Sequence, residues 1–78
     1  MQMNPAVCEV EPKENFVLKL TFENGEIRFF DAKPHFQCEF FRPLSDPEYF
    51  VQVRSVSGTI EWPEGQDFCP DTLYLESR

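Results

Sequence analysis

Residues 16–29 read FVLKLTFENGEIRF, in which two runs of alternating apolar and polar residues flank an Asn-Gly pair. In the first run the apolar side chains recur at every second position: Phe16, Leu18, Leu20 and Phe22. A period of two places these side chains on one face, which predicts a half-buried β-strand. The pair Asn24-Gly25 suits the positive φ angles of a type I′ turn, so the stretch predicts a tight β-hairpin.

The pairing of the two strands follows if Asn24 and Gly25 form a two-residue loop. Apolar residues then lie opposite one another on one face, in the pairs Phe22–Ile27 and Leu20–Phe29. A shift of one residue would move every side chain to the other face of the sheet. This register therefore predicts that Ile27 and Phe29 belong to the core.

A second hairpin is predicted around Ser57-Gly58, because alternating apolar and polar residues lie on both sides of this pair. With a two-residue loop, the facing pairs are Val53–Trp62 and Arg54–Glu61. One pair is apolar and the other joins opposite charges, and both arrangements stabilise a sheet. The register therefore predicts that Trp62 is buried.

The remaining regular elements are short. A strand is expected over residues 6–11, with Pro12 ending it. Asp46 followed by Pro47 is typical of a helix N-cap and first helical residue, so a helical turn is expected there. A proline at the first helical position also predicts a short C-terminal helix, Pro70–Glu76.

Between the two hairpins, residues 32–44 are expected to be irregular. This segment contains three phenylalanines: Phe36, Phe40 and Phe41. They are too apolar for a solvated loop, so we expect them to cover the open face of the sheet. Together these elements predict a single α+β domain, residues 1–78, with a small antiparallel sheet of about five strands, two tight β-hairpins and a short C-terminal helix.

The composition limits the class of partner. The chain of 78 residues carries 14 acidic and 7 basic side chains, a formal net charge of −7. An acidic surface repels nucleic-acid phosphates and anionic lipids, so we expect no direct contact with nucleic acid or membrane and a basic protein as the favoured partner. An odd number of widely spaced cysteines, with no export signal or apolar span, indicates a cytoplasmic protein.

The chain offers little for metal or nucleophilic chemistry. His35 and Cys38 have the spacing of half a zinc site, but a structural site needs about four ligands, and Cys8 and Cys69 have no close partner. We therefore expect no metal or other cofactor, thiols that act as small apolar side chains, and a surface histidine. Because His35 is the only histidine and no glycine-rich oxyanion loop accompanies it, we do not expect an enzyme.

The strongest group of candidate site residues lies in one acidic turn. Its members are Trp62, Glu64, Asp67 and Asp71. Paired carboxylates can exchange protons or hold a hard cation, although this spacing does not match a calcium-binding loop. The favoured alternative is structural: Pro63 and Gly65 shape a turn, and Asp67 caps backbone amides ahead of the final helix.

An ordered series of motifs resembles one bacterial family. The motifs are FENGE at 22–26, FD at 30–31, LSD at 44–46, GTIEWP at 58–63 and DFCPDTLY at 67–74. Over about residues 7–77 the chain resembles the family catalogued as domain of unknown function 2442, whose fold is called NE0471 N-terminal-domain-like. The resemblance implies a compact α+β domain with an antiparallel sheet, and it brings no established activity or catalytic residues.

The same resemblance implies two directions for function. Some relatives carry a helix-turn-helix domain after this one, and others are encoded beside a second small protein, in an arrangement like a toxin–antitoxin pair. This sequence ends at Arg78, directly after the predicted helix. We therefore expect any regulatory role to act through a partner protein.

Two functions stay open. The favoured one is a protein-interaction module, as a component of a regulatory or toxin–antitoxin-like pair, with open sheet edges that can accept a strand. The alternative is a small-ligand-binding or enzymatic domain that uses the acidic turn of residues 64–71, with His35 across the sheet. A homodimer through an edge strand is compatible with either function.

Overall fold

The computed structural model describes residues 4–78, which contain six β-strands and two α-helices. The strands are β1 (Val7–Lys13), β2 (Val17–Phe22), β3 (Ile27–Asp31), β4 (Arg54–Val56), β5 (Thr59–Glu61) and β6 (Asp67–Phe68). The helices are α1 (Pro47–Phe50) and α2 (Pro70–Glu76), with three 3₁₀ helices, η1 (Glu14–Phe16), η2 (Lys33–Gln37) and η3 (Glu39–Ser45). This mixture of helices and antiparallel strands confirms the predicted α+β class.

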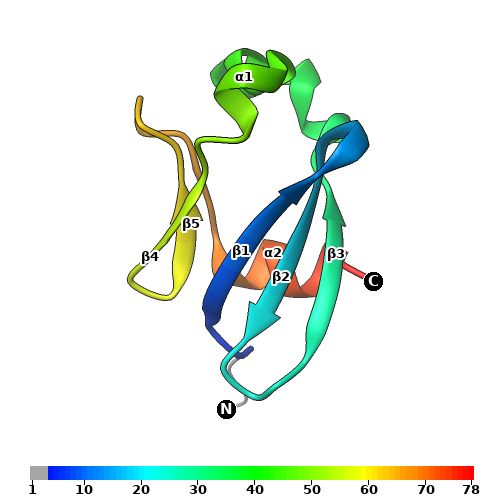
Figure 1. Ribbon diagram of the computed structural model, residues 1–78, viewed down its shortest axis with the longest axis vertical. Coiled ribbons are helices and arrows are strands. Elements are labelled where there is room, and N and C mark those ends of the chain that lie inside the picture. The colour runs from blue at the N-terminus through cyan, green and yellow to red at the C-terminus, as the bar shows by residue number, and fades with distance from the viewer. Residues whose placement is uncertain (1–3) are drawn as a thin grey trace.

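The strands form two antiparallel sheets, in the orders β1-β2-β3 and β4-β5-β6, instead of the single sheet of about five strands that we predicted. A backbone hydrogen bond from the Val7 N–H to the Gly58 carbonyl (2.8 Å) joins the two sheets at one end. From this point β1 and β4 diverge, as Figure 1 shows. Their divergence prevents a continuous ladder and leaves each sheet with its own edge.

The first hairpin has a three-residue loop, one residue longer than predicted. The Phe22 N–H donates to the Glu26 carbonyl (2.8 Å), and the Gly25 N–H donates to the Phe22 carbonyl (2.9 Å). This is a type I turn followed by a glycine at φ +90°. The observed Cα pairs are Val17–Asp31, Leu18–Phe30, Lys19–Phe29, Leu20–Arg28 and Thr21–Ile27. The extra loop residue shifts the register by one, so the predicted core role of Ile27 and Phe29 is wrong; they are 55% and 47% exposed.

Replacing Gly25 by valine is expected to lower the free energy of unfolding by about 1–2 kcal/mol, because a β-branched side chain opposes a positive φ angle. A Cβ atom at this position would have no neighbour within 4 Å, so the cost is backbone strain and not a clash. Urea unfolding followed by circular dichroism measures the difference. An unchanged free energy of unfolding would contradict the turn described here.

The first strand is longer than predicted. We expected residues 6–11 with Pro12 as the end, but β1 continues to Lys13, and Pro12 pairs with Leu18. Proline is tolerated inside this strand because β1 lies at the edge of its sheet, where an N–H directed away from the sheet has no ladder partner to lose. The free edge of β1 therefore extends to Lys13, and it borders the groove described below.

The second hairpin has the predicted register. Ser57 (φ +48°) and Gly58 (φ +84°) form the two-residue loop, and Arg54 pairs with Glu61. The Arg54 Nη2 atom lies 3.3 Å from the Glu61 Oε1 atom. An exposed ion pair contributes about 0.2–1 kcal/mol, so this pair supports the register more than the overall stability.

Both predicted helical elements are confirmed. The Asp46 carboxylate accepts a hydrogen bond from the Glu48 N–H (3.0 Å), as expected of an N-cap before Pro47. The C-terminal helix has the predicted bounds, Pro70–Glu76. Pro70 is its first residue, so the missing proline N–H removes no helical hydrogen bond.

Residues 33–45 form the 3₁₀ helices η2 and η3, where an irregular segment was predicted. Phe36 and Phe41 pack against the core, as expected. Phe40 is 52% exposed, so its predicted burial is wrong. Neighbouring side chains on a short helical turn point in different directions, so Phe41 points toward the core and Phe40 points away from it.

The core lies between the two sheets and α2. Its buried apolar residues are Val7, Leu18, Leu20, Phe22, Phe30, Ala32, Leu44, Phe50, Ile60, Trp62, Phe68 and Leu73. Figure 1 shows α2 behind the β1-β2-β3 sheet and α1 at one end of the molecule. The other face of that sheet, toward the viewer, is not covered by any helix of the described residues. Among residues 4–78, no helix has the length and apolar character that crossing a membrane requires.

Candidate functional site

The predicted acidic turn is a hydrogen-bonded structural unit. The Trp62 N–H donates to the Gln66 carbonyl (2.9 Å), and the Gly65 N–H donates to the Trp62 carbonyl (2.9 Å). The Tyr49 hydroxyl donates to the Gln66 Oε1 atom (2.6 Å) and accepts from the Glu64 N–H (2.8 Å). These contacts hold the turn against α1.

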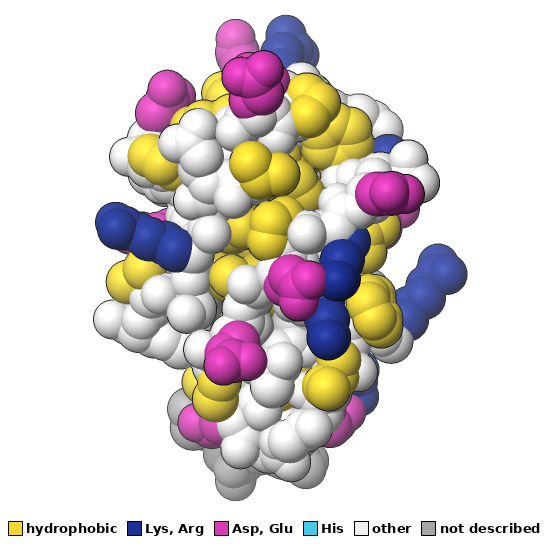
Figure 2. Space-filling view, viewed as in Figure 1, with side chains coloured by type: hydrophobic (Ala, Val, Ile, Leu, Met, Phe, Trp, Pro, Cys, Tyr) yellow, Lys and Arg dark blue, Asp and Glu magenta, His cyan; other side chains and the backbone are white. Residues whose placement is uncertain are grey.

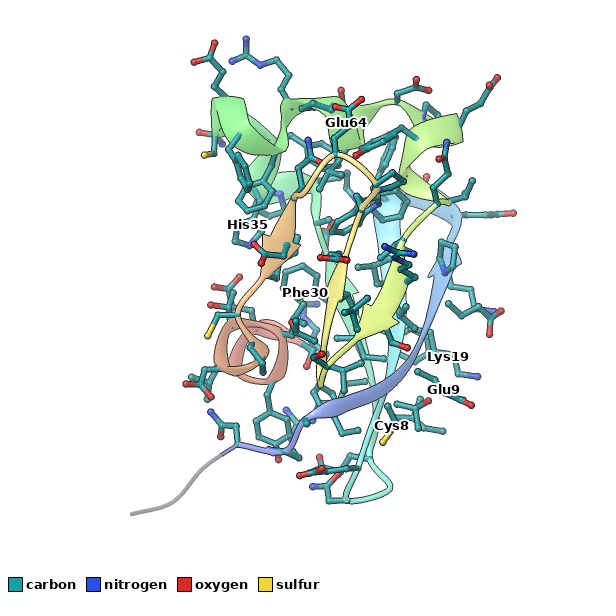
Figure 3. The ribbon with its side chains drawn as sticks, turned by 90° about the vertical axis from the view of Figure 1, so that its left-hand side faces the viewer. Cys8, Glu9, Lys19, Phe30, His35 and Glu64 are labelled. Carbon is teal, nitrogen blue, oxygen red and sulfur yellow. The ribbon has the colours of Figure 1, made fainter. Side chains whose placement is uncertain are left out.

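The side chains of this turn point to different places. Trp62 is buried, as its register predicted, and its Nε1–H donates to the Phe50 carbonyl (2.9 Å). Glu64 lies at the tip of the loop, whereas α2 lies toward the other end of the second sheet, as Figure 3 shows. The tip of the turn and α2 therefore do not form one acidic cleft.

The other two carboxylates are separate as well. Asp67 is exposed in β6, opposite Glu61. The prediction that it caps backbone amides ahead of the final helix is therefore wrong. Cys69 is the N-cap residue of α2, and its side chain makes no capping hydrogen bond. Asp71 accepts a hydrogen bond from the Asn4 side chain (3.1 Å). Within residues 4–78, no hydrogen bond joins the Glu64, Asp67 and Asp71 carboxylates.

His35 is half-buried, where we expected a surface residue. Its ring packs against the rings of Phe30, Phe41 and Phe68, with centroids 5.0–6.0 Å away. The Nε2 atom lies 2.8 Å from the Glu76 Oε1 atom, which connects η2 to α2. The three thiols are exposed, so their expected role as buried apolar groups is wrong. In the part of the chain described, no three His, Cys, Asp or Glu side chains form a group that could hold a metal ion.

The free edge of β1 borders a groove. Toward α1 this groove widens into an open hollow of about 500 Å³, lined by residues 11–16, Pro47, Phe50 and Val51. The Phe16 ring packs edge-on against the Phe50 ring, with centroids 5.3 Å apart. Proline and aromatic side chains make this hollow largely apolar, and we call it the upper hollow.

A second open hollow, of about 510 Å³, continues the groove between β1 and β4. It is lined by residues 9–11, Lys19, Thr21 and residues 53–55, and Glu11 belongs to both hollows. Figure 3 shows Glu9 and Lys19 projecting next to each other from the uncovered face of the first sheet. We call the two hollows together the β1 groove, because residues 9–13 of β1 run along its whole length.

The backbone edge inside this groove has no ladder partner. Outside the β1–β2 pairing, the Val7 N–H bonds to the Gly58 carbonyl and closes the lower end of the groove. Within the described chain, no further backbone hydrogen bond reaches residues 8–13 from another element. An edge strand directs about half of its N–H and C=O groups away from its sheet, and these groups can pair with another strand.

The charge along the groove is uneven: Glu9, Glu11, Lys19 and Arg54 balance in the hollow between β1 and β4, whereas the upper hollow has Glu11, Lys13 and Glu14 and so one acidic side chain in excess. Within residues 4–78, four of the 14 acidic side chains pair with lysine or arginine and Glu76 pairs with His35, which leaves nine with no ion pair there. Glu9 and Glu14 are two of these nine, and both line the groove. Lys13 is already paired with Glu11. Figure 2 shows hydrophobic side chains between α1 and the β1–β2 connection, with acidic side chains on both sides of them.

A separate polar cluster joins the first hairpin to α2. The Glu26 Oε1 atom accepts hydrogen bonds from the Tyr74 hydroxyl (2.6 Å) and the Asn24 amide (2.7 Å). The Glu26 Oε2 atom accepts from the Arg28 Nε atom (2.9 Å). The Arg28 guanidinium also lies 4.0 Å from the centre of the Tyr74 ring. Because these contacts join side chains of the hairpin to Tyr74 on α2, the cluster holds the hairpin loop against that helix.

This cluster predicts an acid-sensitive contribution to stability. The hydrogen bond from Tyr74 is the main cause that lowers the pKa of Glu26 from 4.5 to about 2, with further contributions from Arg28 and Asn24. A lowered folded-state pKa adds stability above the unfolded value, and this stability is lost as the pH falls through about 2. We expect the difference in Tm between the wild type and Glu26→Gln to shrink from about pH 6 to pH 2.

Thermal unfolding across this pH range tests the prediction. Tyr74→Phe removes the largest cause of the lowered pKa, so the same Glu26→Gln change in that background should give a smaller pH-dependent difference. A difference in Tm that stays constant from pH 6 to pH 2 would contradict the described cluster.

The sequence alone did not indicate the β1 groove. Its sides come from residues 9–16 and from residues 47–55, which are far apart in the chain. Val51, which lines the groove, follows α1 and is 58% exposed. The one available signal was the Pro12 position in an apolar–polar run, because proline within a strand indicates an edge.

Comparison with known proteins supports the fold. The family described as "Protein of unknown function (DUF2442)" matches residues 7–78. The chain is similar to the crystal structure of the "Putative DNA Binding Protein NE0471" from Nitrosomonas europaea ATCC 19718, with a TM-score of 0.83 and 26% sequence identity. The similarity covers 99% of this chain and 52% of that protein, so this chain spans about half its length. Among the curated proteins compared, none matches this chain.

Proposed function

This chain belongs to the DUF2442 family of proteins of unknown function, and from that premise we propose that it is a protein-interaction module that binds and does not catalyse. The β1 groove carries this proposal. It combines an unpaired strand edge with an apolar hollow and with Glu14, an acidic side chain that has no ion pair within residues 4–78. Edges and apolar hollows of this kind are the surfaces through which proteins commonly bind other proteins.

The partner that fits is a basic protein. The net charge of −7 attracts cationic surfaces and repels phosphate groups. The similar protein from Nitrosomonas europaea is described as DNA-binding, but this chain spans about half of it. We propose that this domain reaches DNA, where it does so at all, through its partner.

The proposed setting is a regulatory or toxin–antitoxin-like pair in the bacterial cytoplasm, with the partner encoded next to this chain. The three free thiols are compatible with a reducing compartment. A homodimer of this chain is the competing use of the same surface.

Affinity purification from the native host, with the tagged full chain as bait, tests the proposed function. The neighbouring gene's product should also be co-expressed with the bait and the mixture sized by light scattering. We expect one basic partner at fixed stoichiometry. Recovery of the bait alone, as a monomer or homodimer, with no complex in co-expression, would reject the interaction module.

A further inference from the structure

The free edge of β1 and the upper hollow lie in one groove, and this combination indicates how a ligand would bind. Residues 9–13 extend over about 17 Å at the usual rise of a strand. An extended peptide laid along this edge would satisfy the outward-directed backbone groups, of which Pro12 offers a carbonyl and no N–H, and would reach the upper hollow at the Lys13 end. Strand addition of this type takes its affinity from backbone hydrogen bonds and its specificity from side-chain hollows.

The upper hollow is suited to one bulky apolar side chain. Phe16 and Phe50 hold each other in an edge-on contact, and Pro12 and Pro47 are restricted by their rings. Val51 lines the hollow and is 58% exposed, so it has apolar surface left to bury. A preformed apolar hollow binds an anchor residue without the cost of ordering its own side chains.

The charge of the ligand follows from the acidic side chains. Glu14 lines the upper hollow and has no ion pair within residues 4–78, whereas Lys19 and Arg54 balance Glu9 and Glu11 in the other hollow. Glu48, on α1 beside Pro47, is also without an ion pair in the described chain. Lysine or arginine side chains on the ligand would complement these carboxylates, whereas an acidic ligand would be repelled.

We propose that the β1 groove binds an extended basic segment of a partner protein as an added strand along β1, with one bulky apolar side chain in the upper hollow. This inference rests on the proposed function, since it names the surface and the peptide chemistry of the interaction. The segment carries a leucine or aromatic anchor and at least one lysine or arginine that faces Glu14.

A library of random seven-residue peptides, displayed on phage and selected against the full chain, tests the chemistry. We expect enriched sequences to share one leucine or aromatic residue and a net positive charge. The Kd of a synthetic enriched peptide, measured by fluorescence polarisation, should rise about tenfold or more in Val51→Lys, which places a charge in the apolar hollow. Ile27→Lys is the matched control, because Ile27 is 55% exposed and lies outside the groove.

A second pair of variants tests the charge. Glu14→Lys should weaken peptide binding about two- to fivefold, with a smaller effect at high salt. Glu23→Lys makes the same charge change at an exposed position outside the groove, and its Kd should equal that of the wild type. Both substitutions are on the surface, so circular dichroism should show folded protein in each case.

N-methylation of the peptide backbone tests the added strand. In an antiparallel or parallel strand, alternate N–H groups face the partner. We expect methylation at alternate positions to abolish binding, and methylation at the positions between them to be tolerated. A Kd that is insensitive to methylation would reject strand addition.

Other results would also overturn the proposal. It fails if no peptide is enriched, if enriched peptides bind Val51→Lys as well as they bind wild type, or if Val51→Lys converts a wild-type homodimer to a monomer. A partner captured from the host that binds Val51→Lys and wild type equally would reject this groove while it supports the interaction module. The two proposals therefore fail by different measurements.

Discussion

Replacing Trp62 by alanine is expected to lower the free energy of unfolding by about 3–5 kcal/mol, the range for deleting a large aromatic side chain from a core. The indole is 1% exposed and contacts the rings of Phe50 and Phe68, with centroids 5.9 Å away in each case. A domain of 78 residues has a total stability of roughly 4–12 kcal/mol, so this one substitution should remove between about a quarter and all of it.

Trp62→Phe separates the packing of the ring from its hydrogen bond. Phenylalanine keeps an aromatic ring but leaves the Phe50 carbonyl without the Nε1–H donor. We expect Trp62→Phe to cost less than Trp62→Ala, with part of its loss from the unsatisfied carbonyl at about 1–3 kcal/mol. Urea unfolding followed by far-ultraviolet circular dichroism measures both. A loss below about 1 kcal/mol for Trp62→Ala would mean that the indole is not buried.

The sequence was sufficient for elements whose chemistry is local. In the second hairpin, Ser57 and Gly58 both have positive φ angles, so the two-residue loop fixes the register and places Trp62 in the core. The N-cap at Asp46 and the helix that begins at Pro70 also depend on neighbouring residues alone. Each of these was predicted from a few consecutive positions.

The first hairpin shows where local reasoning fails. Asn24-Gly25 is compatible with a two-residue type I′ loop, but it is equally compatible with a type I turn in which Gly25 alone has a positive φ angle. The two loops differ by one residue and reverse the faces of the second strand. The second strand of this hairpin has apolar side chains on both of its faces. The alternation of apolar and polar residues therefore did not distinguish the two registers.

The candidate site could not be found locally for a related reason. The β1 groove exists because β1 and β4 diverge after the Val7–Gly58 hydrogen bond, and this depends on the packing of two sheets. The predicted acidic turn, in contrast, is a sequence cluster whose carboxylates the fold directs to different places. The carboxylates of the acidic turn are close in sequence, but the structure separates them. The residues that line the β1 groove are far apart in sequence, but the structure brings them together.

Two alanine substitutions at adjacent positions distinguish the registers experimentally. In the structure Phe30 is fully buried and packs against the Phe68 ring (5.1 Å between centroids), whereas Phe29 is 47% exposed. We expect Phe30→Ala to lower the free energy of unfolding by about 3–5 kcal/mol and Phe29→Ala by less than about 1 kcal/mol. A two-residue loop would produce the opposite order, because it turns Phe29 toward the core and Phe30 toward solvent. Parallel urea titrations of the two variants therefore decide the register, since both remove the same side chain and differ only in the face from which it is removed.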